Sequence, residues 1–247
     1  MTKIGIIGAM DIEVRLLTSR MTGADGVGEA EKTTIASVTY YDGQIDGVNV
    51  VVVRSGIGKV NAALCAQRLV LLFGVSHIIN TGIAGAVAHG LSVLDMVISS
   101  DAMYHDFDVT PFGYQSCVVP QMEVSDFVAD EKLVSLASKA FEELSADKES
   151  GFEGHKLVTG RVASGDQFIS SQVQKAHIRT LCNPACVEME GAAIAHACYL
   201  NKVPFLIIRC ISDMADDGGE STYSFNEDTA AKMSAELVLK MLPEIRA

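Results

Sequence analysis

Residues 187–213 read VEMEGAAIAHACYLNKVPFLIIRCISD, and this stretch decides how the rest of the chain is interpreted. Its second half has the length and composition of a buried strand, yet it carries Arg209 and ends at Asp213. Its first half places two more carboxyl groups, Glu188 and Glu190, beside an alanine-rich run. Burying unpaired charge costs far more than an ordinary core contributes. These groups are therefore expected either to pair with one another or to face a ligand.

A strand at 187–190 would place both glutamates on one face and Met189 on the other, because side chains alternate along a strand. Gly191 can then change the chain direction before an alanine-rich helix. A solvated sheet edge is the alternative interpretation of this segment. The Ala, Ile and Val residues on either side favour a buried setting instead.

Asp213 taken alone could merely cap a turn, which is the commoner role of a single aspartate. It follows the end of the expected strand 203–211, where open α/β sheets usually bind ligands. Together with Glu13, Glu190 and Arg209, this position favours a functional site over a structural cap.

The composition excludes several classes of protein. With 19 Lys and Arg against 31 Asp and Glu, the net charge of −12 disfavours a nucleic-acid partner. The apolar runs are far shorter than the roughly 18 residues of a membrane-spanning helix, so no membrane partner is expected. Six cysteines without a C-x-x-C pair are typical of a reduced compartment, which predicts a cytoplasmic location.

Alternating strand and helix patterns run through the chain without a linker or repeat. Strands are expected at 4–8, 33–42, 48–53, 77–81, 95–100, 157–164, 187–190 and 203–211. A first helix is expected after a cap at Asp11, with Val14, Leu17 and Met21 on one face. Further helices are expected at 56–73, 130–144, 170–181 and 225–242. An acidic loop at 216–224 is expected before the last of them. The pattern predicts one α/β domain over residues 1–247, a three-layer α/β/α arrangement with a twisted, mixed central sheet.

Some familiar motifs are absent or incomplete. Residues 55–60 resemble a P-loop, but Val53 and Val60 stand where that motif needs a glycine and a hydroxyl residue. The G-x-S-x-G elbow of α/β-hydrolases is missing. Residues 104–108, YHDFD, contain metal-ligand types without a second cluster at ligand spacing, so a capped turn is the preferred interpretation and no metal is expected.

Six segments in order nevertheless resemble one family, the bacterial 5′-methylthioadenosine/S-adenosylhomocysteine nucleosidases. They span nearly the whole chain: 5–10 with Glu13, 55–59, 80–85, 164–169, 187–190 and 211–213. The resemblance implies a homodimeric hydrolase with a nucleoside phosphorylase-like fold and no cofactor. Its substrates would be small nucleosides, methylthioadenosine and S-adenosylhomocysteine, cleaved to adenine and the thioribose in methionine salvage. 5′-Deoxyadenosine is a further candidate substrate.

The resemblance also implies roles for individual residues. Asp213 would protonate the purine at N7 with help from Ser212, and Glu13 would activate water with help from Arg209. Glu190 would bind the ribose hydroxyls. The other substrate-binding positions would be Met10, Ile57, Ala84, Gly85, Phe168 stacked on adenine, the Ile169 backbone, Glu188, Met189 and Phe225. Val109, Phe112 and Pro120 match positions that reach across the dimer to the 5′-alkylthio tail.

These roles are chemically reasonable. Glycosidic cleavage passes through a cationic sugar that carboxylates can stabilise, and adenine leaves readily only when protonated. Phosphorylases of this fold carry an arginine, which binds phosphate, where Asn80 stands in this chain. The acidic Asp11 and Glu13 near the first strand would repel phosphate. Water is therefore the expected nucleophile. Ile83 and Ala86 depart from the family pattern. The alternatives are a futalosine-type hydrolase, a phosphate-dependent purine nucleoside phosphorylase and a non-enzymatic nucleoside-binding module.

Overall fold

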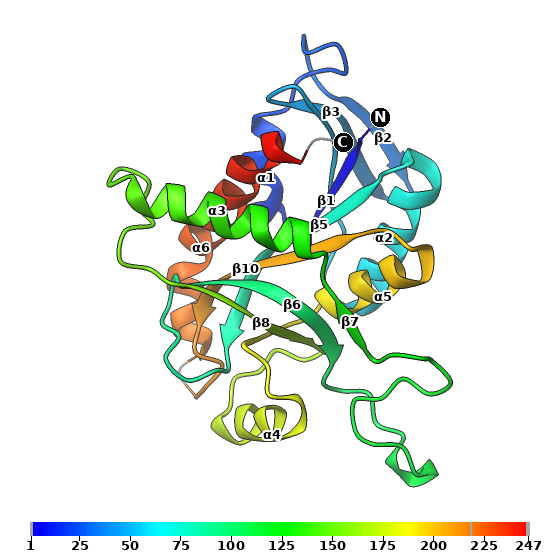
Figure 1. The fold of residues 1–247 in the computed structure, drawn as a ribbon, viewed down its shortest axis with the longest axis vertical. Helices are drawn as coiled ribbons and strands as arrows, with labels where there is room; N and C mark the ends of the chain where they lie inside the picture. The colour runs from blue at the N-terminus through cyan, green and yellow to red at the C-terminus, as the bar shows by residue number, and fades with distance from the viewer. Residues whose placement is uncertain (1, 218, 246–247) are drawn as a thin grey trace.

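The computed structural model describes residues 2–217 and 219–245, and its centre is one curved, mixed β-sheet (Figure 1). Its strand order is β10-β6-β8-β9-β5-β1-β4-β3-β2, with β7 paired to β6. The strands are β1 (Ile4–Gly8), β2 (Glu31–Ile35), β3 (Val38–Ile45), β4 (Val48–Arg54), β5 (His77–Ala86), β6 (Met96–Tyr104), β7 (Asp126–Val128), β8 (Leu157–Ser164), β9 (Cys186–Glu188) and β10 (Phe205–Asp213). The predicted α/β class with a mixed central sheet is confirmed.

The sheet also closes partly on itself, which the strand patterns did not predict. β10 pairs with both β6 and β5, so β5, β9, β8, β6 and β10 form a ring. β1, β5 and β10 are parallel neighbours, with Asn80 aligned to both Ile7 and Ile207. Their carboxyl ends therefore meet at one edge of the sheet, where ligands bind in open α/β folds.

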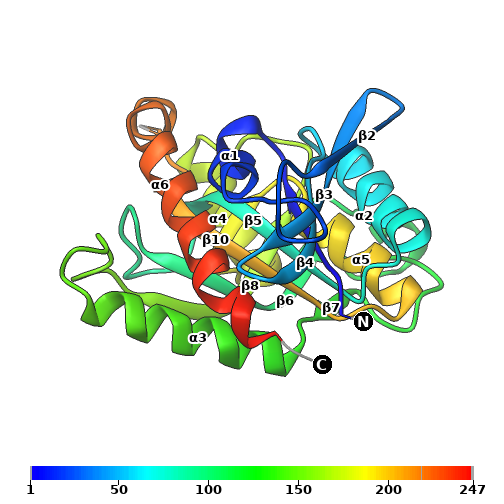
Figure 2. The ribbon, with the colours of Figure 1, turned by 90° about the horizontal axis from the view of Figure 1, so that it is seen from above.

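Helices cover both sides of the sheet (Figure 2). α2 (Lys59–Phe73) packs beside α5 (Gly191–Asn201) on one side. On the other side, α6 (Gly219–Met241) contacts α1 (Asp11–Ser19) and α3 (Glu131–Ala146). α4 (Gln172–Cys182) lies between β8 and β9 in the chain, and two short 3-10 helices span Thr110–Phe112 and Leu242–Glu244. β10 is buried along its whole length, as expected for a strand covered on both faces.

The expected strand at 33–42 is wrong, because this segment forms parts of two strands. β2 and β3 are antiparallel neighbours, and Ala36 and Ser37 between them have φ values of 48° and 67°. Two consecutive residues in the left-handed region make a tight hairpin turn. Sequence patterns signal such a turn through Gly or Asn, and neither residue is present here. The predicted connection between β3 and β4 is an antiparallel hairpin.

Two expected helix starts are also wrong. Met10, not Asp11, is the N-cap of α1, and the Glu13 side chain accepts a hydrogen bond from the Met10 backbone N–H. Asp11 instead forms an ion pair with Arg54 at 2.8 Å. α6 begins at Gly219 rather than Phe225, so most of the expected acidic loop is helical. A hydrogen bond of 3.1 Å from Tyr223 Oη to Glu227 Oε1 joins successive turns of this early part of α6.

The segment between β6 and β7 extends away from the body of the molecule (Figure 1). It carries the 3-10 helix Thr110–Phe112, and Phe112 has 83% of its surface exposed. The backbone N–H of Cys117 donates to the Phe107 carbonyl at 2.9 Å and closes the base of this loop. Within residues 2–217 and 219–245, no helix has the length and apolar character needed to cross a bilayer.

Candidate active site

A cavity of about 530 Å³ opens where β1, β5, β9 and β10 end. Its wall includes residues from positions 9 to 224, so distant parts of the chain build it together. The lining residues are Ala9, Met10, Glu13, Ile57, Ile83, Ala84, Gly85, Phe168, Val187, Glu188, Met189, Glu190, Ser212, Asp213, Tyr223 and Ser224. We call the part around Glu13, Glu188, Glu190 and Arg209 the arginine end, and the part around Ala84, Gly85, Ser212 and Asp213 the Asp213 end.

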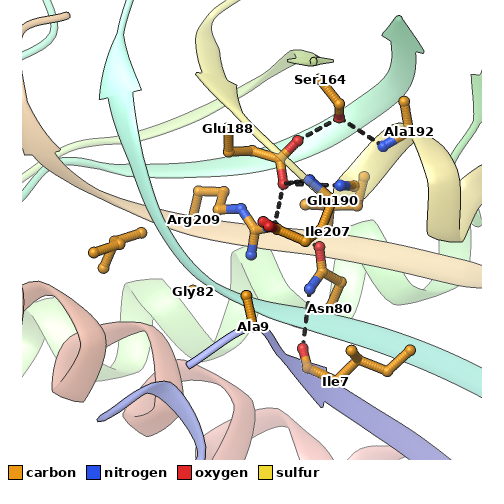
Figure 3. Close-up of polar contacts among 12 residues, drawn as sticks. Ile7, Ala9, Asn80, Gly82, Ser164, Glu188, Glu190, Ala192, Ile207 and Arg209 are labelled. Atoms are coloured by element: carbon orange, nitrogen blue, oxygen red, sulfur yellow. Dashed lines mark hydrogen bonds and ion pairs between the residues drawn. The ribbon is translucent and has the colours of Figure 1, made fainter. Parts of the chain in front are cut away.

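Arg209 lies beneath the cavity wall and is only 1% exposed. Its Nη2 donates to Glu188 and to Asn80 Oδ1 at 2.6 Å, and it lies 3.8 Å from Glu190 Oε2 (Figure 3). Asn80 in turn donates to the Ile7 carbonyl at 2.9 Å, which ties the arginine to the first strand. Burial alone would lower the pKa of this guanidinium, but the surrounding carboxylates raise it, so Arg209 stays charged.

Glu188 holds this arginine and the start of α5 in place. It accepts hydrogen bonds from Ser164 Oγ, Arg209 and the backbone N–H groups of Glu190 and Gly191 (Figure 3). Burial alone would raise the pKa of Glu188, but Arg209 and these hydrogen bonds outweigh it and hold the pKa below its usual value. Glu188 is therefore an ionised partner of Arg209 as well as part of the wall.

Glu13 is held from three directions by backbone groups. It accepts hydrogen bonds from the N–H groups of Ala9 at 2.6 Å, Met10 at 3.0 Å and Ile83 at 3.1 Å. Burial raises the pKa of Glu13, and the charge of Arg209 works against that rise. A Cβ atom at Gly82 would contact Glu13 Oε1 and lie 2.7 Å from Arg209 Nη1. Glycine at this position thus leaves space between the carboxylate and the guanidinium.

Glu190 is the N-cap of α5 rather than part of β9, because that strand ends at Glu188. Its Oε1 accepts the Gly58 N–H at 2.8 Å, at the start of α2. Burial, followed by the nearby charge of Glu188, raises the pKa of Glu190 to about 8. A carboxyl group in this state can both donate and accept hydrogen bonds near neutral pH.

Asp213 ends β10 and is 2% exposed. Two neutral donors hold it: Ser212 Oγ at 2.9 Å and the Ala215 N–H at 2.8 Å. Burial raises the pKa of Asp213 and outweighs these hydrogen bonds. A Cβ atom at Gly85 would lie 2.9 Å from Asp213 Oδ1, so glycine permits this close approach of β5 and β10. The Asp213 end therefore presents a carboxyl group that holds a proton more readily than an ordinary aspartate does.

The outer wall of the cavity is largely apolar. The rings of Phe168 and Tyr223 meet edge to face with centroids 5.6 Å apart, and Tyr223 Oη contacts Met10 Sδ at 3.6 Å. Sequence reasoning missed Tyr223 and Ser224, because it assigned both to a loop. Ala9 and Val187 were also missed, although both adjoin predicted site residues.

Most predicted site residues come together in the cavity wall, but several lie elsewhere. Ile169 is buried behind the wall in a small apolar cluster, and Arg209 lies beneath it. Phe225 has 86% of its surface exposed and is not among the lining residues. Val109, Phe112 and Pro120 belong to the extended β6–β7 segment and also lie outside the cavity of this single chain.

The described residues hold no group of three or more His, Cys, Asp or Glu arranged to bind a metal ion. The 104–108 segment instead makes local contacts. Asp106 pairs with Lys59 at 2.5 Å and accepts the Asp166 N–H at 3.0 Å.

Comparison with known proteins first gives the class. The chain matches the sequence model of the family described as "Phosphorylase superfamily" over residues 3–243. A 5′-methylthioadenosine/S-adenosylhomocysteine nucleosidase from Colwellia psychrerythraea is 43% identical over 247 residues, covering 99% of this chain and 97% of the relative. A crystal structure of the nucleosidase from that organism in complex with adenine is similar with a TM-score of 0.90 at 41% identity, covering 99% and 96% of the two chains.

A futalosine hydrolase from Helicobacter pylori is also similar, with a TM-score of 0.89 at 27% identity, covering 99% of this chain and all of the other. Its sequence is much less similar than that of the nucleosidase. The chain therefore belongs to the phosphorylase superfamily and, within it, to the 5′-methylthioadenosine/S-adenosylhomocysteine nucleosidases, a family of N-glycosyl hydrolases.

Proposed function

We propose that this chain releases adenine from methylthioadenosine and S-adenosylhomocysteine, with Asp213 as the general acid and Glu13 as the base that activates water. One observation carries the assignment: a single cavity has a protonatable carboxyl group at one end and a cluster of carboxylates around an arginine at the other. Departure of adenine requires a proton, whereas the ribose develops positive charge. The two ends supply these two needs.

The Asp213 end would hold the purine. Asp213 would donate its proton to N7, and Ser212 would orient the carboxyl group through the 2.9 Å hydrogen bond. Ala84 and Gly85 would lie along the base, and Phe168 would stack on it. The backbone of Ile169, whose side chain is buried behind the wall, would bind the edge of the base from its position next to Phe168. An aspartate with its ordinary pKa of about 3.9 would be ionised at pH 7, so the raised pKa supports this role.

The arginine end would hold the sugar and the nucleophile. Glu190 would bind the ribose hydroxyls, Met189 would pack on the ring, and Glu13 would take a proton from water. Nε and Nη1 of Arg209 have no hydrogen-bond partner within residues 2–217 and 219–245. Because Nη1 lies near Glu13 across Gly82, a water molecule there could accept from the guanidinium while donating to the carboxylate.

Water is a better nucleophile here than phosphate. Asn80 is engaged with Arg209 and the Ile7 carbonyl, and the carboxyl groups of Glu13 and Glu190 line the same cavity. In its ionised form, each of these carboxyl groups would repel a phosphate ion. With methylthioadenosine we expect full adenine release in phosphate-free buffer, measured by chromatography, and no methylthioribose 1-phosphate on adding phosphate. A requirement for phosphate would overturn the hydrolytic assignment.

The substrate range is tested by one panel of nucleosides. The similarity to a futalosine hydrolase keeps futalosine-type nucleosides as the second candidate substrates. Release of base from methylthioadenosine, S-adenosylhomocysteine, 5′-deoxyadenosine and a futalosine should favour the adenosine thioethers in kcat/KM. A higher kcat/KM for futalosine would reverse this order, and binding of all four without release would favour a nucleoside-binding module.

We also propose that the protein is a homodimer in which a second copy completes each cavity. α2 presents Val60, Leu64 and Leu71 on one exposed face, and grouped exposed apolar side chains mark protein–protein contacts. Ile57, at the start of the same helix, is half exposed and lines the cavity. Val109, Phe112 and Pro120 would then reach the cavity of the other copy.

Light scattering on a sizing column tests the dimer. Leu64→Lys should shift the mass toward one chain, whereas the control Val173→Lys, a similar change at an exposed apolar residue of α4, should leave the dimer intact. A wild-type protein that elutes as one chain would overturn the proposal. We further propose one domain over residues 1–247, supported by the single sheet, and a cytoplasmic location, supported by six free cysteines.

A further inference from the structure

A buried lysine lies behind the Asp213 end of the cavity. Lys175 belongs to α4 and is only 7% exposed, on the face of that helix that also buries Ile178 and Cys182. Lysine is rarely buried to this degree without a partner. Its Nζ donates to the backbone carbonyl of Met214, the residue directly after Asp213, at 2.5 Å. The lysine therefore connects α4 to the turn that follows the proposed acid.

The peptide unit that Lys175 binds also holds Asp213. The Met214 carbonyl and the Ala215 N–H belong to one planar peptide, so fixing the carbonyl also fixes the direction of the N–H. That N–H donates to Asp213 Oδ1 at 2.8 Å. Hydrogen bonds in such a chain polarise one another and strengthen together. A continuous path of two hydrogen bonds thus runs from the lysine ammonium group to the carboxyl group of the proposed acid.

The turn at Ala215 has a backbone conformation that needs support. Ala215 has a φ value of 48°, in the left-handed region that residues with a Cβ atom adopt only at a cost. A Cβ atom at Gly85 would lie 2.9 Å from the Ala215 Cβ, so β5 packs closely against the same turn. Strained backbone persists only where the surrounding structure holds it. The hydrogen bond from Lys175 holds this turn from the side of α4.

Arg179 provides a comparison on the same helix. It lies one turn further along α4, and its Nε and Nη2 both donate to the Val87 carbonyl, at 3.2 Å from Nε. Val87 directly follows the end of β5. Arg179 therefore anchors α4 to the sheet through a different peptide from the one that holds Asp213. The two cations of α4 allow anchoring of the helix to be distinguished from support of the acid.

We propose that Lys175 is a positioning residue for the general acid and acts through the Met214–Ala215 peptide. It orients the N–H that binds Asp213 and supports the carboxylate that forms when the Asp213 proton passes to the leaving base. Lys175 keeps its own protons in this step. Hydrogen bonds to an ionised acceptor are about twice as strong as those to a neutral one, so the Ala215 N–H stabilises Asp213 most after the proton has left. The proposal rests on the proposed function, because it requires Asp213 to be the acid.

The charges around Lys175 and Asp213 agree with this direction. Burial raises the pKa of Asp213, and the charge of Lys175 works against that rise, whereas the charge of Asp216 adds to it. Burial lowers the pKa of Lys175, the charges of Asp216 and Asp213 oppose that fall, and Arg179 adds to it. A cation at this position thus makes Asp213 a stronger acid than burial alone would leave it.

Two substrates separate positioning of the acid from a purely structural role. Lys175→Met should lower kcat for adenine release from methylthioadenosine about 10-fold with KM little changed, because a hydrogen bond to a charged group contributes about that factor. With the nitrophenyl glycoside of methylthioribose, whose leaving group needs no proton, the same variant should keep most of its kcat. Lys175→Arg retains a cation with N–H donors and should recover most of the loss.

Two further variants complete the test. Arg179→Met is the matched control, because it removes a cation from α4 without touching the Met214 carbonyl, and any loss of kcat should be equal on the two substrates. Lys175→Gln keeps a polar side chain but lacks the charge, and provides the same test where the methionine variant does not fold. Equal losses on both substrates for the Lys175 variants, or normal kcat with methylthioadenosine, would overturn the proposal. Wild-type protein that releases no adenine, or normal release by Asp213→Asn, would instead overturn the proposed function.

Discussion

The two ends of the cavity contain similar acids in different electrostatic settings. At the arginine end, Glu13, Glu188 and Glu190 surround one buried guanidinium. At the Asp213 end, a single carboxyl group accepts hydrogen bonds from a hydroxyl and a backbone N–H. Arg209 and several hydrogen bonds together outweigh burial and hold the pKa of Glu188 below its usual value, whereas burial raises the pKa of Glu13 and brings that of Glu190 to about 8. The pKa of Asp213 rises because burial outweighs its neutral donors.

This difference shows that environment, more than residue type, assigns the roles of acid and stabiliser. Carboxyl groups gathered around a fixed cation, with Glu188 ionised, suit a sugar that becomes positively charged. An isolated, protonatable carboxyl group suits a base that must leave with a proton. Changes that alter one end while leaving the other intact should therefore separate two kinds of defect.

The largest effect is expected from Asp213→Asn, which removes the acid while keeping the shape of the side chain. General acid catalysis contributes about 10²–10⁴-fold, so kcat for adenine release should fall about 10³-fold. The fold should persist by thermal melting. Asp216→Asn, the same change three positions along the chain, is the matched control and should retain most activity. Near-normal release by Asp213→Asn would contradict its role.

Arg209→Met should have the largest effect on stability. It leaves three buried carboxyl groups without their cation, and breaking a buried ion pair costs about 3–5 kcal/mol. Urea unfolding would measure this loss. Arg54→Met is the control, because its exposed pair with Asp11 should contribute less than about 1 kcal/mol. Similar small losses in both variants would mean that Arg209 does not organise its end of the cavity.

Glu190 should make stability depend on pH in a predictable direction. Its pKa in the folded protein is about 8, above the ordinary value of 4.5, so folding favours the protonated form. That contribution is complete below pH 4.5 and is lost as pH rises through 8. Relative to wild type, Glu190→Gln should gain about 2–4 kcal/mol of unfolding free energy across this range. Chemical denaturation at several pH values gives the difference.

The control for this dependence of stability on pH is Glu143→Gln, because Glu143 forms an exposed ion pair with Lys240. The pKa of Glu143 is lowered by its hydrogen bond with Lys240, so this variant should show no gain between pH 4.5 and 8. A flat difference curve for Glu190→Gln would mean that Glu190 ionises as an ordinary glutamate.

The smallest effect is expected at the apolar rim near Asp213. Phe168→Leu keeps an apolar side chain but removes the stacking surface, so KM should rise about 3- to 10-fold with kcat little changed. Tyr223→Phe keeps the edge-to-face contact with Phe168 and should change KM less. Initial-rate kinetics would measure both variants. A large fall in kcat for Phe168→Leu would assign this ring a role beyond base binding.

The sequence predicted local features better than distant contacts. The strands at 4–8 and 157–164 have the predicted bounds, because their apolar composition and flanking polar residues are local signals. Ring closure between β10 and β5 depends on pairing across more than half the chain, and no local pattern records it. The hairpin at Ala36 and Ser37 lacks the glycine or asparagine that usually marks such a turn.

Within the site, too, local features were predicted better than contacts between distant parts of the chain. The apolar setting of residues 187–213 predicted that its charges must pair or face a ligand; the structure shows the pairing and an acid in the cavity wall. Glu188 is paired with Arg209, although the two lie on separate elements, while Asp213 lines the cavity. Tyr223 was missed because its early helical turn contains polar and glycine residues that suggested a loop.

The most direct test of the division between the two ends is a substrate whose leaving group needs no proton. Asp213→Asn and Glu190→Gln should each be measured with methylthioadenosine and with the nitrophenyl glycoside of methylthioribose. Asp213→Asn should lose about 10³-fold in kcat with the adenine substrate but little with the nitrophenyl substrate. Glu190→Gln should lose activity with both. Equal losses of Asp213→Asn on the two substrates would contradict the assignment of Asp213 as the acid.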